Sequence, residues 1–289
     1  MPRVLSNGLE LEYDAAGDPA DPALVLVMGL GAQLTGWDDR LRDLFVAQGF
    51  HVIRFDNRDI GLSTGLDHLP MPDLGAIVSG DLSSAPYLVA DLADDLLGLL
   101  DGLRIERAHV VGVSMGGMIT QQLAITHPER LLSLCSIMST TGDRSVGQVT
   151  PEALATFGQP PGDRAAIVER SIANSRLMSG TSFPFDEEDA RAKYGAAYDR
   201  SYRPLGSLRQ TAAVLASPDR TEALRGVRVP TVVIHGSADP LVDRSGGEAT
   251  AAAIPDAELL IIEGLGHRLS PEAWPAIVDA VVRNAKRAA

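Results

Sequence analysis

His109-Val-Val-Gly-Val-Ser-Met-Gly-Gly-Met118 is an apolar stretch that breaks into glycines around a single serine. Residues 108–113 have the length and the valine content of a buried strand, and residues 115–126 carry apolar side chains at helical spacing. Gly112 and Gly116 flank Ser114 in the pattern G-x-S-x-G, which lets a strand and a helix approach closely around a strained serine. We therefore expect a strand-turn-helix unit that exposes the Ser114 hydroxyl at the edge of a sheet. The alternative is a buried turn with an incidental serine.

Short apolar runs alternate with helical patterns on both sides of this stretch. The other runs expected to form strands are 24–28, 51–55, 132–138, 231–235 and 258–262, and helical patterns occupy 37–48 and 88–100. Asn7-Gly8 predicts a tight antiparallel hairpin between residues 4–5 and 9–13. This alternation is typical of an α/β fold with a mostly parallel sheet. Ser270 and Pro271 can start a terminal helix, although Pro275 leaves its first residue uncertain.

The alternation stops after residue 138 and resumes at residue 231. Residues 142–215 are rich in Arg, Asp, Glu and Ala and look helical between breaks at Pro160-Pro161 and Pro184. We expect an inserted helical cap, with the core formed by residues 1–141 and 216–289. Side chains that could roof an apolar cavity are Met178, Phe183, Phe185, Tyr194, Tyr198 and Tyr202. Each of these taken singly is better explained by packing within the cap, and Met178 and Phe183 are kept as pocket candidates.

Composition limits the possible functions. The chain of 289 residues is 45% hydrophobic and 22% charged, as expected for one globular core with an insertion, and its net charge of -13 argues against binding to nucleic acid. A small substrate with little or no charge fits better. Cys135 lies in an apolar run and is expected to be an inert core residue. The chain shows no cysteine-histidine cluster, G-x-G-x-x-G or P-loop, so we expect neither a metal nor a cofactor.

The N-terminal residues lack the long apolar segment of a signal peptide. The longest apolar stretch, residues 23–32, is too short to cross a bilayer. We therefore expect a cytoplasmic protein with no membrane association.

Residues 66–87, rich in Pro, Gly and Ser, are expected to be a mobile surface excursion that borders a pocket.

A serine hydroxyl is almost wholly protonated at neutral pH and needs a neighbouring base, which in turn needs a partner that fixes its tautomer. His267 and Asp239 follow the ends of predicted strands, as Ser114 does, and such ends meet at one edge of a parallel sheet. His235 and Asp243 are the rivals. His235 precedes the acid in the chain, and Asp243 is better explained as a solvated side chain or a helix cap.

A glycine-rich loop, Met28-Gly-Leu-Gly-Ala-Gln33, follows the strand at 24–28. In an acyl-transfer enzyme of this architecture, the loop at this place supplies one backbone N–H of the oxyanion hole, and the residue after the nucleophile supplies the other. Leu30 and Met115 are the candidates, with Gly29 beside the substrate. The polar turn Asp56-Asn-Arg-Asp-Ile-Gly-Leu-Ser63 is expected to close on itself through its Asp and Asn side chains.

Three motifs together resemble the α/β-hydrolase superfamily: Gly112-Val-Ser-Met-Gly116, His235-Gly-Ser-Ala-Asp239 and Gly264-Leu-Gly-His267. The order Ser, Asp, His is also that of α/β-hydrolases. The resemblance implies an eight-stranded, mostly parallel sheet with a cap after the sixth strand.

More narrowly, the chain resembles the aclacinomycin methylesterase branch of carboxylic ester hydrolases. The segments that carry this likeness are Val27-Met-Gly-Leu30, Val52-Ile-Arg-Phe-Asp-Asn-Arg-Asp59, Ser179-Gly180 and Pro184-Phe-Asp186. It implies a cofactor-independent serine esterase acting on a small alkyl or methyl ester. Met28-Gly29 replaces the His-Gly of many superfamily members, a change that this branch shares. A serine nucleophile also argues against a haloalkane dehalogenase or an epoxide hydrolase, because those use a carboxylate.

Two other functions remain open from the sequence. The same triad could cleave a lactone or a carbon-carbon bond next to a ketone. The chain could also be a ligand receptor that keeps a hydrolase shell without turnover. The protein is expected to be a monomer or a homodimer.

Overall fold

The computed structural model describes residues 1–157 and 162–288, and within them eight strands form one sheet in the order β1-β2-β4-β3-β5-β6-β7-β8. The strands are β1 (Arg3–Ser6), β2 (Leu9–Ala16), β3 (Ala23–Val27), β4 (His51–Phe55), β5 (Ala108–Val113), β6 (Leu131–Ile137), β7 (Thr231–Gly236) and β8 (Glu258–Ile262). β1 and β2 run antiparallel to their neighbours, and the other strands are parallel. The α/β fold with a mostly parallel sheet is therefore confirmed.

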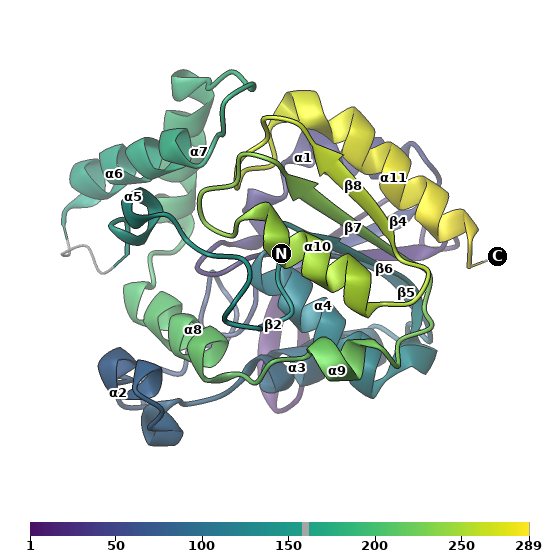
Figure 1. Ribbon diagram of the computed structural model, residues 1–289, viewed down its shortest axis with the longest axis horizontal. Helices are drawn as coiled ribbons and strands as arrows, with labels where there is room; N and C mark the ends of the chain where they lie inside the picture. The colour runs from purple at the N-terminus through teal and green to yellow at the C-terminus, as the bar shows by residue number, and fades with distance from the viewer. Residues whose placement is uncertain (158–161, 289) are drawn as a thin grey trace.

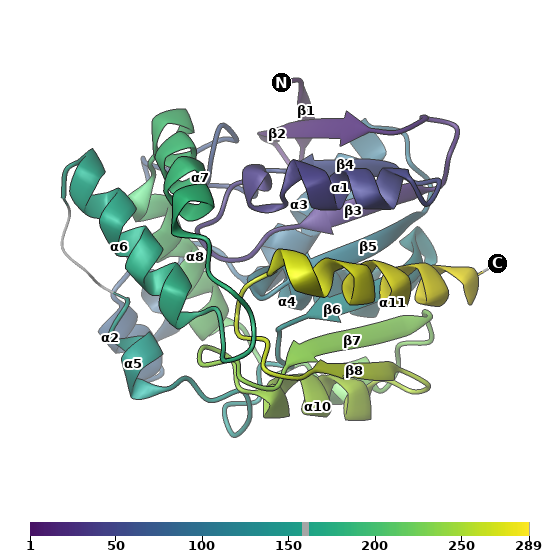
Figure 2. The ribbon, with the colours of Figure 1, turned by 90° about the horizontal axis from the view of Figure 1, so that it is seen from above.

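Helices cover both faces of this sheet (Figures 1 and 2). One face carries α3 (Val89–Gly102), α4 (Met115–Thr126) and α10 (Arg244–Ala253), and the other carries α1 (Asp39–Val46) and α11 (Trp274–Lys286). The short elements are α2 (Leu74–Val78), α5 (Pro151–Leu154), α9 (Thr221–Leu224), η1 (Leu34–Gly36), η2 (Leu82–Ser84), η3 (Pro128–Arg130) and η4 (Pro271–Ala273). In the described part of the chain, none of the helices is long and apolar enough to span a membrane.

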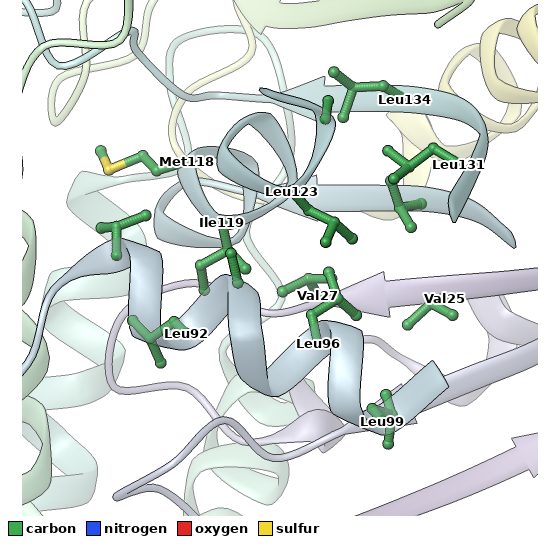
Figure 3. Packing of buried hydrophobic residues seen from close by; sticks show 14 of the residues in the cluster. Val25, Val27, Leu92, Leu96, Leu99, Met118, Ile119, Leu123, Leu131 and Leu134 are labelled. Atoms are coloured by element: carbon green, nitrogen blue, oxygen red, sulfur yellow. The ribbon is translucent and has the colours of Figure 1, made fainter. Parts of the chain in front are cut away.

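The core on the first face joins α3 and α4 to the central strands (Figure 3). Leu92, Leu96 and Leu99 project from α3 at helical spacing and pack with Ile119 of α4, all with no measurable exposure. Removing this apolar surface from water is the main stabilising term for such a layer. Cys135 is buried in the cluster on the opposite face, where burial raises the pKa of its thiol.

The Asn7-Gly8 hairpin forms as expected. Asn7 and Gly8 have positive φ angles of 48° and 77°, which a two-residue turn between antiparallel strands requires. Residues 3–6 pair with residues 9–12 in register. The hairpin thus adds the two antiparallel edge strands to the parallel sheet.

The segment between β6 and β7 is helical. Its longer helices are α6 (Arg164–Leu177), α7 (Glu187–Arg200) and α8 (Pro204–Ala216), which lie beyond the end of the sheet toward which β7 points (Figure 2). α6 and α7 share a small apolar core around Val168 and Ile172, and α8 packs against α2. The expected break at Pro184 falls between α6 and α7, and the one at Pro160-Pro161 lies outside the described residues.

Two details differ from expectation. Residues 66–87 are largely exposed, as expected of a surface excursion, but Ile77 of α2 and Tyr87 are buried, since α2 packs on a helix more than a hundred residues later in the chain. At the C-terminus, Ser270 and Pro271 begin the turn η4, and α11 starts only at Trp274. Pro275 is therefore in the first turn of α11, where no backbone N–H is needed.

Candidate active site

Ser114 occupies a strained turn between β5 and α4. Its φ and ψ are 56° and -120°, a combination that non-glycine residues rarely adopt and that is found at functional sites. A Cβ at Gly112 would overlap the carbonyl oxygen of Gly116, and a Cβ at Gly116 would overlap that of Val27. The two glycines thus allow the close approach that the turn requires, and they leave Ser114 partly exposed.

Asp239 and His267 are hydrogen-bonded to each other at the same edge of the sheet. His267 Nδ1 lies 2.7 Å from Asp239 Oδ2, and the backbone N–H groups of Leu241 and Val242 donate to Asp239 Oδ1 over 2.8 and 2.9 Å. An ionised carboxylate only accepts hydrogen bonds, so Nδ1 carries the proton and Nε2 is left as an acceptor. The arrangement fixes the tautomer that a general base needs.

Ser114 and His267 follow β5 and β8, whose carboxyl ends lie at the same edge of the sheet. Among the described residues, Ser114 Oγ makes no hydrogen bond to His267. In enzymes without bound substrate such contacts are often long and tighten only in the complex. The structure therefore joins the candidate acid and base directly, and places the candidate nucleophile at the same edge without a bond to them.

The glycine-rich loop after β3 lies against Ser114. A Cβ at Gly29 would come within 3.2 Å of Ser114 Cβ. Within the described part of the chain, the backbone N–H groups of Leu30 and Met115 donate to no acceptor. Both are thus free to bind an anion near the serine.

Side chains from distant parts of the chain hold this loop. Asn57 Nδ2 donates to the Met28 carbonyl over 3.0 Å, and Asp56 Oδ1 accepts from Leu34 N over 2.7 Å. The Gly31 N–H donates to Gln210 Oε1 over 2.8 Å, and Gln210 Nε2 donates to the Arg58 carbonyl over 3.0 Å. The loop is therefore fixed on both sides of Leu30.

The turn at residues 56–63 closes on itself in part, as predicted, because Asp56 Oδ2 accepts from Leu62 N and Ser63 Oγ donates to the Asp56 carbonyl. Its carboxylates also reach outward. Besides the loop after β3, Asp56 binds Arg200 of α7, and Asp59 binds Arg209 of α8. Burial raises the pKa of Asp56, opposed by the N–H groups of Leu34 and Leu62 and by Arg200. The carboxylates of this turn thus connect the loop after β3 with the inserted helices.

A cavity of about 260 Å³ adjoins His267. Met178, Tyr194 and Arg268 are among the residues that line it. Phe183, the other pocket candidate from the inserted segment, does not line this cavity and packs, partly buried, against the apolar cluster beneath α1 and α11. Phe185, Tyr194 and Tyr198 pack against the core shared by α6 and α7, as the sequence favoured.

The rivals for the acid and the base have other partners. His235 has no exposed surface, its Nε2 lies 2.8 Å from the Val242 carbonyl, and burial lowers its pKa, so it stays neutral. It also lies 3.5 Å from Asp239 Oδ2. Asp243 is the N-cap of α10 and accepts from Ser245 N.

No group of three or more potential metal ligands occurs among residues 1–157 and 162–288.

Curated relatives of the chain are hydrolases. Rhodomycin D methylesterase DnrP of Streptomyces peucetius is 28% identical over 99% of this chain and 98% of its own length. The 3-oxoadipate enol-lactonase 2 of Acinetobacter baylyi is 24% identical over 97% of this chain and 96% of its own. The likeness to methylesterases that the motifs indicated is thus confirmed along the whole chain.

Solved structures have the same fold. The meta-cleavage product hydrolase of Pseudomonas fluorescens IP01 superposes with a TM-score of 0.79 at 21% identity, covering 100% of this chain and 98% of that one. The enol-lactonase of Burkholderia xenovorans LB400 gives 0.75 at 24% identity, with coverages of 99% and 100%. Residues 22–273 also match the family described as the alpha/beta hydrolase fold. The chain therefore belongs to the α/β-hydrolase family and is a hydrolase.

Proposed function

We propose that the protein is a serine hydrolase of carboxylic esters, acting on a small alkyl or methyl ester through a Ser114-His267-Asp239 triad. The observation that carries the proposal is the 2.7 Å bond between Asp239 and His267, at the sheet edge where Ser114 occupies a strained turn. The ester preference is supported by the methylesterase relative.

In the proposed reaction, Ser114 Oγ attacks the ester carbonyl while His267 Nε2 takes its proton. The Leu30 and Met115 N–H groups bind the oxyanion, and Asp239 stabilises the imidazolium. His267 then protonates the leaving alcohol, which departs and leaves an acyl-enzyme. Water, deprotonated by His267, releases the carboxylic acid and restores the serine. We further propose that residues 142–215 form a cap over this site, with Gly29 and Met178 beside the substrate.

Lactone or carbon-carbon bond cleavage is the second candidate. It is favoured by the enol-lactonase relative and would use the same triad, because a lactone is a cyclic ester. A receptor without turnover is the candidate of another class.

Initial rates on methyl esters, lactones and β-diketones of matched chain length separate these functions. The proposal predicts the highest kcat/KM for methyl esters, with all turnover lost in Ser114→Ala. A higher kcat/KM for lactones or diketones would overturn the ester assignment but keep the triad. Saturable binding without turnover of any of the three would favour the receptor.

A further inference from the structure

The cavity beside His267 is lined by an arginine that pairs with none of the described carboxylates. Arg268 lines it, is partly buried and forms no ion pair within the part of the chain that the structure describes. The chain has 38 Asp and Glu against 25 Lys and Arg, so most arginines have acidic partners within reach. None of the described residues lining the cavity is an Asp or a Glu.

The guanidinium of Arg268 is held in place without being neutralised. Its central carbon lies 5.2 Å from the centroid of the Phe185 ring, a cation–π distance. One of its nitrogens lies 3.5 Å from Ser179 Oγ, whose own proton goes to the Ser175 carbonyl over 2.8 Å. Ring and hydroxyl orient the group and leave donors for a ligand, since guanidinium has five N–H groups.

The other side chains of the cavity suit a small polar group. Ser171, Asn174 and Tyr194 supply hydroxyl and amide groups, and Met178 supplies the apolar surface. His267 lines the same cavity, so an occupant lies beside the proposed general base. Arginine binds a carboxylate through two parallel hydrogen bonds, a geometry that a phosphate shares and that a carboxylate fits in a small cavity.

We propose that Arg268 is a specificity residue that binds a free carboxylate of the substrate, so that the preferred substrate is the monoester of a dicarboxylic acid. This inference rests on the proposed esterase function, because it names the substrate class of the same site. It makes the substrate singly charged, so that Arg268 would supply a local positive charge within a chain whose net charge is -13.

The test compares monomethyl adipate with its neutral isostere of equal length, methyl heptanoate, in wild type, Arg268→Gln and Arg268→Lys. Wild type should have the higher kcat/KM on the monoester. Arg268→Gln should lower that value by about ten- to a hundredfold through loss of a charged hydrogen-bond pair, and leave the neutral ester within about twofold. The kcat/KM of Arg268→Lys on the monoester should lie between those of wild type and Arg268→Gln, because lysine keeps the charge but not the two parallel N–H donors.

Arg176→Gln is the matched control. Arg176 stacks on the same Phe185 ring, at 4.6 Å, but pairs with Glu187 and does not line the cavity. The Arg176→Gln substitution removes one positive charge and one contact with the same ring, and it should leave the preference for the monoester unchanged.

Binding gives a readout apart from turnover. Adipate titrated into the Ser114→Ala variant should bind, as measured by calorimetry. The double variant Ser114→Ala/Arg268→Gln should not bind it. Equal losses of kcat/KM on both esters in Arg268→Gln, or no preference of the wild type for the monoester, would overturn the inference. The proposed function would stand in that case if Ser114-dependent hydrolysis of the neutral ester were seen. Absence of hydrolysis of either ester would instead contradict the function, and adipate binding would still decide the role of Arg268.

Discussion

Asp239 is the residue whose role the geometry defines most sharply, since both of its oxygens are committed. One accepts from two backbone N–H groups and the other from His267. An amide in its place would keep the shape but could present an N–H to Nδ1 and so select the wrong tautomer.

Asp239→Asn should therefore lower kcat by about ten-thousandfold with little change in fold. The control is Asp243→Asn, four residues later, which alters only the N-cap of α10 and should leave kcat within about twofold. Steady-state kinetics and circular dichroism measure both. Similar kcat values for the two variants would contradict the role of Asp239.

His109 is a buried histidine that the proposed chemistry does not use. Its Nδ1 lies 2.8 Å from Ser133 Oγ, and burial, with a smaller contribution from Arg107, lowers its pKa from 6.5 to about 4. The folded protein thus keeps His109 neutral where the unfolded chain binds a proton. Its contribution to stability is complete above about pH 6.5 and is lost as the pH falls toward 4.

Replacing His109 by Gln should reduce this acid sensitivity. Between pH 7 and pH 5 the wild type should lose about 1 kcal/mol more of its free energy of unfolding than His109→Gln, allowing for solvent screening. Urea unfolding at both pH values measures the difference. The result that contradicts this account is an equal or larger loss in the variant.

At the scale of elements, α8 connects the inserted helices to the loop after β3. Gln210 has no exposed surface and bridges Gly31 N–H to the Arg58 carbonyl. Gly31 follows the proposed oxyanion donor Leu30 directly. A displacement of this loop would weaken binding of the transition state more than that of the ground state.

Gln210→Leu should consequently lower kcat by about ten- to a hundredfold, with KM changed less than threefold. Thr211→Val is the control on the same helix, because that hydroxyl donates to the Ser207 carbonyl within α8. Gln210→Glu keeps the acceptor for Gly31 N–H and should recover part of the loss. A loss confined to KM or to thermal stability would show that Gln210 only supports the fold.

The elements of the core could be predicted from sequence because their signals are local. Apolar runs bounded by glycine and proline gave the strands, and Asn7-Gly8 gave the hairpin. The packing of residues 66–87 could not be predicted, since Ile77 is buried by a helix far along the chain. Local composition contains no information about such a partner.

For the candidate site, the proposed triad residues could be named from the sequence because each follows a strand, and strand ends meet at one edge. The contacts around them were not found. Gln210 is separated from Gly31 by 179 residues, and nothing near Gln210 marks it as a partner of a loop. Asn57 belongs to the polar turn after β4, which the sequence marks. Its hydrogen-bond acceptor, the Met28 carbonyl, is placed beside it only when β3 and β4 pair.

At the scale of the whole molecule, the sheet brings three segments to one edge and the inserted helices lie beyond it (Figure 2). The central claim is that this edge holds a serine that forms a covalent intermediate. A fluorophosphonate that phosphonylates activated serines tests it most directly, with peptide mass mapping of the site and ester hydrolysis measured on the same sample. The account predicts a label on Ser114, absent in Ser114→Ala, and hydrolysis that falls in proportion to labelling. Full hydrolysis by protein labelled at Ser114, or by Ser114→Ala, would contradict it.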